Sequence, residues 1–116
     1  MTYVMSYVAA VPAAKKAEYV QHCELAAAIF KDHGATRVEE CWGDQVPPGE
    51  VTSFPLAVKA QKDEVVVTGW QEWPDKATHD AHIQDAMQDP RFQDMRDMPF
   101  DGKRLIFAGF ETILDV

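Results

Sequence analysis

Two cysteines and four histidines are the residues of this sequence best able to act as nucleophiles, bases or metal ligands. Cys41 lies in the segment ECWGD, directly between Glu40 and Trp42. A reactive cysteine has its pKa lowered by a basic neighbour or a helix N-terminus, and acidic neighbours act in the opposite direction. We therefore predict that Cys41 is a buried strand residue, and that Cys23 is a packing residue of a helix.

Two of the histidines are candidate metal ligands. His79 and His82 lie three residues apart in a segment that reads as a helix, so they share a helix face. Zinc needs three or four converging ligands, and neither HExxH nor CxxC occurs. We predict no metal site and two histidines on a solvated helix face. A triad, a phosphate loop and a dinucleotide fingerprint are also missing from the sequence, so we expect no cofactor.

His22 and Glu40 are the candidates for acid–base catalysis. His22 borders an apolar helical stripe, where a histidine is either a satisfied boundary residue or a general base near neutral pH. Glu40 is an acid or base if it points into an apolar cavity, because desolvation raises a carboxyl pKa. It is structural if it faces solvent or pairs with an arginine. Tryptophans line a pocket or belong to the core or an interface. The candidate pocket residues are Tyr19, His22, Glu40, Trp42 and Trp70.

Local signals place these side chains on secondary-structure elements. Pro12 suits the first turn of a helix, and Gly34 suits a left-handed helix end. Asp75 is a good helix N-cap, and that helix should stop before Pro90. We predict strands over residues 3–11, 36–43, 64–73 and 104–113, with a strand extension over 56–60, and helices over 13–33 and from 75. We predict a loop over 44–55, and a short helical turn followed by a loop over 91–100.

The order strand, helix, strand, strand, helix, strand predicts an α+β, ferredoxin-like βαββαβ fold: a four-stranded antiparallel sheet with two helices on one face. The 116 residues fit a single domain over 1–116. Strands over 3–11, 64–73 and 104–113 carry apolar side chains on both faces, while two helices cover only one. An uncovered apolar face of this size is unusual on a monomer. We therefore predict a homodimer packed through the sheet face.

The charge and hydropathy of the chain disfavour two classes of partner, nucleic acids and membranes. Lys and Arg number 11 against 19 Asp and Glu, a net charge of -8, which disfavours nucleic acid. No stretch approaches the roughly 20 apolar residues of a membrane helix, so we expect no membrane partner. The start of the chain lacks a basic signal-peptide region, and two cysteines make no secreted framework. We expect a cytoplasmic protein with reduced thiols.

Several segments resemble the YbaA-like family of uncharacterised bacterial proteins. They are AVP (10–12), FKDHGA (30–35), EECWGDQVPPGEVTSFPLAV (39–58), WQEWPDKA (70–77) and PFDGKRLIFAGFE (99–111). The resemblance covers essentially the whole chain. It implies membership of the dimeric α/β-barrel superfamily, which includes cofactor-free monooxygenases, haem-degrading enzymes and muconolactone-isomerase-like proteins. Because that superfamily is chemically diverse, the resemblance implies a fold and a dimer but no particular activity.

Two functions remain open from the sequence. The first is a homodimer that binds a small organic molecule, with cofactor-independent chemistry in which Glu40 or His22 acts as acid or base. The second is a non-catalytic structural or partner-binding dimer whose aromatic residues all belong to the core and interface. A pocket lined by a titratable residue with a shifted pKa favours the first, and a filled interior with His22 and Glu40 solvated favours the second.

Overall fold

The computed structural model describes residues 1–95 and 97–116 of the chain. In this part no helix is long and apolar enough to cross a membrane. The elements in chain order are β1 (Tyr3–Pro12), the 3-10 turn η1 (Ala13–Lys15), α1 (Lys16–Asp32), β2 (Arg37–Trp42), α2 (Phe54–Ala57), β3 (Glu64–Trp73), α3 (Lys76–Met87), the 3-10 segment η2 (Pro90–Met95) and β4 (Ile106–Glu111).

The strands form one sheet in the order β2-β3-β1-β4, and every neighbouring pair is antiparallel. β1 and β3 form the centre, paired from Tyr3 opposite Trp73 to Pro12 opposite Glu64. The predicted α+β fold with a four-stranded antiparallel sheet is confirmed, and the arrangement is consistent with a ferredoxin-like one.

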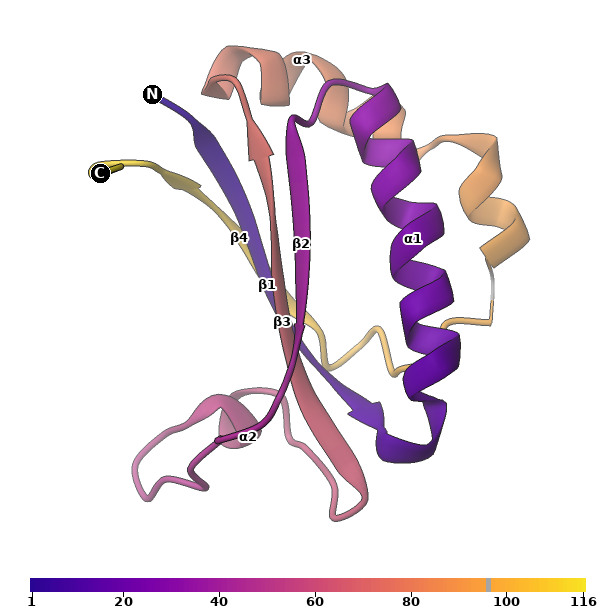
Figure 1. Ribbon diagram of the computed structural model, residues 1–116, viewed down its shortest axis with the longest axis vertical. Helices are drawn as coiled ribbons and strands as arrows, with labels where there is room; N and C mark the ends of the chain where they lie inside the picture. Colours follow the sequence, from indigo (N-terminus) through magenta and orange to yellow (C-terminus); the bar gives the residue numbers. More distant parts are fainter. Residues whose placement is uncertain (96) are drawn as a thin grey trace.

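α1 and η2 lie on one side of the sheet, and α2 lies on the other (Figure 1). Because side chains alternate along a strand, Tyr7, Glu40 and Val67 point toward α1, and their neighbours point away. Ala9, Val11, Tyr19 and Val67 form the buried cluster on the helix side. The centre of the sheet is thus the floor beneath α1.

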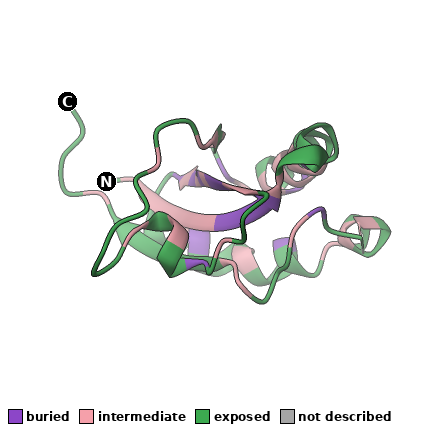
Figure 2. Cartoon of the chain, turned by 90° about the horizontal axis from the view of Figure 1, so that it is seen from below, coloured by how far each residue is buried: buried purple, intermediate pink, exposed green. Residues whose placement is uncertain are grey.

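The opposite face is covered at one end only. Val58, from the segment after α2, packs on Ala10 and Val66 in a second buried cluster. Every residue of β4 is exposed, including Ile106 and Phe110 (Figure 2). This face therefore remains open over β4, and we call it the open face: the side chains of β1, β2, β3 and β4 that point away from α1, beyond the α2 loop.

Helix boundaries follow the predicted signals in most places. The Asp75 carboxylate accepts from the Thr78 N–H at 2.7 Å, and α3 ends at Met87, before Pro90. Gly34 adopts a left-handed φ of +124° just after α1. Pro12 differs from its prediction, since it ends β1 opposite Glu64 and precedes η1.

The predicted strand extension over 56–60 is wrong. Residues Phe54–Ala57 form α2 instead. The Ser53 hydroxyl accepts from the Leu56 N–H at 3.1 Å, and Pro55 occupies the first turn. A capping serine followed by a proline favours helix initiation, and this local signal outweighs the apolar residues that follow.

Candidate functional site

Glu40 is the centre of the candidate site. It lies in the middle of β2 and points to the helix side of the sheet, where it lines a cavity of about 460 Å³ beneath α1. Of the two sequence-based alternatives for Glu40, the structure displays the one in which it faces an apolar cavity. No arginine hydrogen bond to Glu40 occurs among the described residues.

Two tyrosines hold the Glu40 carboxylate. The Tyr19 hydroxyl of α1 donates to Oε2 at 2.9 Å, and the Tyr7 hydroxyl of β1 donates to Oε1. Tyr7 and Glu40 are not on adjacent strands: both pair with Gly69 of β3, one from each side. Because Gly69 has no side chain, the phenol and the carboxylate can meet above its backbone.

Burial dominates the electrostatics of this cluster. It raises the pKa of Glu40, although the hydrogen bonds from Tyr7, Tyr19 and the Cys23 thiol act in the opposite direction. Burial, followed by the charge of Glu40, also raises the pKa of both tyrosines, so their hydroxyls remain proton donors. The same two causes raise the pKa of Cys23 to about 12. The cluster is therefore a carboxyl group poised to take up a proton, supported by protonated donors.

His22 lies one helical turn from Ala26 on the same wall of the cavity. Its ring packs edge-on against Phe100, with centroids 5.4 Å apart, and beside Tyr19 at 6.5 Å. Burial lowers the pKa of His22, which favours the neutral imidazole. A neutral, half-buried imidazole can accept or donate one hydrogen bond inside the cavity.

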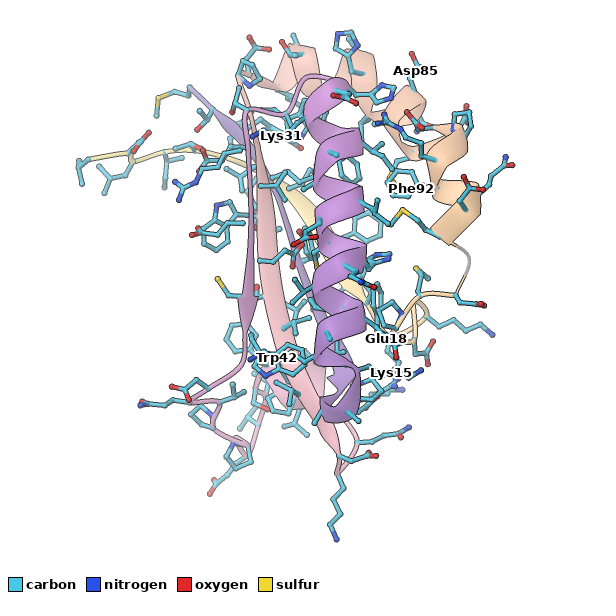
Figure 3. All side chains as sticks on the ribbon, turned by 45° about the vertical axis from the view of Figure 1, so that its right-hand side comes forward. Lys15, Glu18, Lys31, Trp42, Asp85 and Phe92 are labelled. Atoms are coloured by element: carbon cyan, nitrogen blue, oxygen red, sulfur yellow. The ribbon has the colours of Figure 1, made fainter. Side chains whose placement is uncertain are left out.

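The remaining wall is apolar and comes largely from η2 and the segment after it. Phe92, labelled beside α1 in Figure 3, packs on Phe30 with ring centroids 5.6 Å apart. The other wall residues from this region are Met95, Met98, Phe100 and Leu105. Carbon and sulfur atoms thus make up most of the described lining, and Glu40 supplies its one carboxyl group.

Ion pairs anchor this wall at both ends. Arg91 donates to Asp32 at the end of α1 at 2.8 Å, and His33 contacts Asp89 at 2.8 Å. Further along, both Arg104 Nη atoms donate to the Glu64 carboxylate at 2.7 Å. The segment between these anchors carries the aromatic and methionine side chains, so the anchors fix the wall against α1 and β3.

The predicted pocket residues take three different positions. Tyr19, His22 and Glu40 line the cavity together. Trp42 lies beside it, with its ring 6.2 Å from that of Tyr19 and under Lys16 Nζ at 5.3 Å (Figure 3). Trp70 is placed elsewhere, because it pairs with Ser6 and Glu39 and shares their side of the sheet, the open face. Alternation along β3 is the reason, since Gly69 and Gln71 take the helix side.

The predicted burial of Cys41 and the predicted solvent exposure of His79 are both wrong. Cys41 is exposed, because its strand neighbour Glu40 takes the inward position. His79 is buried, packed between Tyr3 and Trp73 at ring distances of 4.7 and 5.4 Å, so only its helix neighbour His82 is solvated. Within residues 1–95 and 97–116, no three His, Cys, Asp or Glu side chains come together as metal ligands would.

Tyr7 and Gly69 are the site residues that sequence reasoning missed. The sequence pattern places Tyr7 on a strand, but only the register shows that it reaches Glu40. The signal available in sequence was the glycine inside VVVTGW, because an interior strand glycine often marks a close approach of other groups.

Comparison with known proteins adds the following findings. Residues 2–102 match the family model described as "Protein of unknown function (DUF1428)". Proteins named "Uncharacterized protein YbaA" from Escherichia coli strain K12 and from Shigella flexneri are each 50% identical over 116 residues, covering 99% of both chains. Among solved structures, the de novo designed protein Foldit4 aligns with a TM-score of 0.49 at 12% identity, over 97% of this chain and 99% of that one. So weak a likeness carries no argument.

Proposed function

The chain belongs to the DUF1428 family of YbaA-like proteins, and we propose that it is a homodimer that binds a small apolar organic molecule and moves a proton on it without a cofactor. The observation that supports this most directly is the Glu40 carboxyl group, held by Tyr7 and Tyr19 in the wall of an apolar cavity of about 460 Å³. Such a volume lies within the range of small-molecule sites.

The proposed chemistry is an isomerisation by proton transfer. The Glu40 carboxylate removes a proton from a C–H or O–H group of the bound molecule, and burial favours the neutral acid that results. The Glu40 carboxylic acid, whose O–H hydrogen exchanges with solvent, then returns a proton to a different atom of the same molecule. No oxidant, reductant or second substrate enters this cycle, which is why it suits a site without a cofactor. The Tyr7 and Tyr19 hydroxyls stabilise the ionised form between turnovers, and the His22 imidazole is the second group able to exchange a proton.

A thermal-shift screen tests the binding step. The purified protein is screened against neutral aromatic, quinone, lactone and aldehyde metabolites, with haem and flavin included. A ligand at 100 times its Kd stabilises the fold by about 2.7 kcal/mol. We expect hits that weaken in Glu40→Gln and His22→Ala and persist in Glu39→Gln. Glu39 is the matched control because its side chain lies on the opposite face of β2.

Deuterium exchange tests the chemical step. Each hit is incubated with the protein in D2O and examined by mass spectrometry. Exchange into a C–H position of the ligand by the unmodified protein, and its loss in Glu40→Gln, is the expected result. Binding without exchange in any hit would contradict the catalytic part of the proposal.

The proposed homodimer forms through the open face. Phe110 is 54% exposed and Ile106 is 45% exposed. The C-terminal segment extends away from the sheet (Figure 2), and its Ile113 and Leu114 are exposed as well. Two copies packed face to face would bury these side chains and give the dimeric α/β-barrel arrangement that the sequence resemblance implies. The exposed thiol of Cys41 on this face also supports a reducing compartment, and we propose the cytoplasm.

Light scattering coupled to size exclusion tests the dimer. We expect two copies per particle for the unmodified chain and one for Phe110→Asp. Val51→Asp is the matched control, because Val51 is 98% exposed but lies in the loop before α2. A monomeric parent at micromolar concentration would refute the dimer.

The second candidate function is a non-catalytic dimer that binds a partner protein. The fully exposed β4 and the apolar segment after it favour this alternative. Both functions predict a dimer, so the oligomeric state does not separate them. A dimer in solution that binds no compound of the ligand panel would favour the non-catalytic function.

A further inference from the structure

Two hydrogen-bond donors that line the cavity, the Tyr7 and Tyr19 hydroxyls, are already committed to Glu40. The hydroxyl hydrogens of Tyr7 and Tyr19 both point to the Glu40 carboxylate. Each carboxylate oxygen has two lone-pair sites, so each retains acceptor capacity after accepting one tyrosine. The Gln71 Oε1 atom accepts from Trp73 Nε1 at 3.2 Å. What the tyrosine–glutamate cluster offers to a guest is therefore an acceptor.

The described walls also lack a cation. No Lys or Arg lies among the described residues that line the cavity. The nearest arginines along the chain that the structure describes are Arg91, engaged by Asp32 and Asp89, and Arg104, engaged by Glu64 and Asp101. The His22 ring is disposed to be neutral. An anionic guest would thus enter an apolar space beside Glu40, at a desolvation cost that no positive charge of the described lining offsets.

Aromatic faces strengthen the same preference. Rings of Phe30, Phe92 and Phe100 line the space together with Tyr19 and His22. The faces of such rings attract cations, and quaternary and protonated amines are recognised by aromatic enclosures of this kind. The net charge of -8 adds a long-range attraction for cations.

We propose that the cavity selects apolar molecules whose polar end is a hydrogen-bond donor, preferring an ammonium group over a hydroxyl, and that it rejects carboxylates of the same shape. This inference rests on the proposed ligand-binding function and adds the chemical class of the ligand. Glu40 accepts from the donor, and the aromatic and methionine side chains enclose the apolar body.

Three probes of one shape test it: 2-naphthylmethylamine, 2-naphthylmethanol and 2-naphthoate, titrated by calorimetry. We expect the amine to bind more tightly than the alcohol, and the carboxylate to show no heat of binding. Glu40→Gln should weaken the amine by about tenfold to 100-fold, the value of a charge-assisted hydrogen bond. Glu39→Gln should leave the affinity for the amine unchanged. If the overall negative charge alone attracted the amine, Glu40→Gln would bind it as tightly as the parent does.

The outcomes separate this inference from the proposed function. Binding of naphthoate as tight as that of the alcohol would overturn the inference and leave the ligand cavity standing. The variant Arg96→Ala, at the one position outside the described residues, would then show whether that side chain supplies the positive charge. If compounds of the wider panel bind but none of the three probes does, this inference is overturned and the proposed ligand-binding function still stands. No binding of any compound would remove the proposed function, and this inference with it.

Discussion

Tyr7 and Glu40 meet across an intervening strand. They lie on β1 and β2, and the residue between them on β3 is Gly69, which pairs with both. The Tyr7 hydroxyl donates to Glu40 Oε1 directly above that glycine. A hydrogen bond that spans three strands is available only where the middle residue has no side chain, so Gly69 is part of the site although it carries no functional group.

Replacement of Gly69 tests this relationship. A methyl group there would lie 2.7 Å from Glu40 Oε2, 2.8 Å from Tyr7 Cε2 and 2.7 Å from the Glu39 carbonyl oxygen. Because the carbonyl belongs to a paired strand and cannot retreat, we expect Gly69→Ala to destabilise the fold by about 1–3 kcal/mol in urea unfolding.

Gly102→Ala is the control for the added methyl group. At that position a methyl would meet only the flexible end of Met98, at 2.8 Å. Equal stability of the two variants would contradict the crowding argument.

The Tyr19 hydroxyl should stabilise ionised Glu40. Tyr19→Phe removes the 2.9 Å donor to Oε2 and leaves the aromatic ring in place. We expect a loss of about 1.5–3 kcal/mol in unfolding free energy near pH 7, the value of a hydrogen bond to a charged group. The pKa of Glu40, followed by carbon-13 NMR of the carboxyl group, should rise further.

Tyr3→Phe controls for the loss of a phenolic hydroxyl. The Tyr3 hydroxyl makes no hydrogen bond within the described part of the chain, although its ring packs on His79. An unchanged Glu40 pKa in Tyr19→Phe would show that this donor does not hold the carboxylate.

Glu40 should make stability fall as pH rises. Its pKa in the folded protein lies above the ordinary value of 4.5. The folded state therefore holds a proton that the unfolded state has released, and the favourable contribution is complete below pH 4.5 and lost as pH rises through the folded pKa. Urea unfolding of the parent and of Glu40→Gln at several pH values should show the parent declining relative to the variant. The decline should be about 1.4 kcal/mol for every pH unit that separates the folded and unfolded pKa values of Glu40. A pH-independent difference between the two proteins would contradict a raised pKa.

The two cysteines should differ in reactivity. Cys41 is exposed, whereas Cys23 is half-buried with its pKa raised to about 12, so it is almost entirely protonated at pH 8. In the Phe110→Asp background, which we expect to be monomeric, one thiol should react rapidly with Ellman's reagent. Cys41→Ser should abolish that phase, and Cys23→Ser should keep it. A slower phase in the parent than in Phe110→Asp is expected if the open face is covered by a second copy.

Much of the fold could be predicted from local pattern. The alternation in EVVVTGWQEW, the N-cap at Asp75 and the helix end at Gly34 act over a few residues, and the structure has each of them at the expected place. Where two local signals compete, the prediction fails: the Ser53 cap and Pro55 produce α2 next to residues 56–60, which favour a strand by their apolar character.

The site was predictable only in part. The helical spacing that puts Tyr19 and His22 on one face is local, and both line the cavity. Their counterpart on the sheet was not determined, because a strand presents two faces and alternation alone treats them alike. The same ambiguity placed Trp70 in the candidate pocket and Cys41 in the core, and both lie on the other side.

The sequence by itself determined the order of the four strands and the two long helices, and with it the α+β class, because periodicity, caps and turns are short-range properties of the chain. Only the tertiary structure decided that Glu40 points inward and that Gly69 separates it from Tyr7. Strand register and the choice of the covered face depend on residues far apart in sequence. For the same reason, the raised pKa of Glu40 is a property of the folded protein, since its burial is supplied by α1 and by strands distant along the chain.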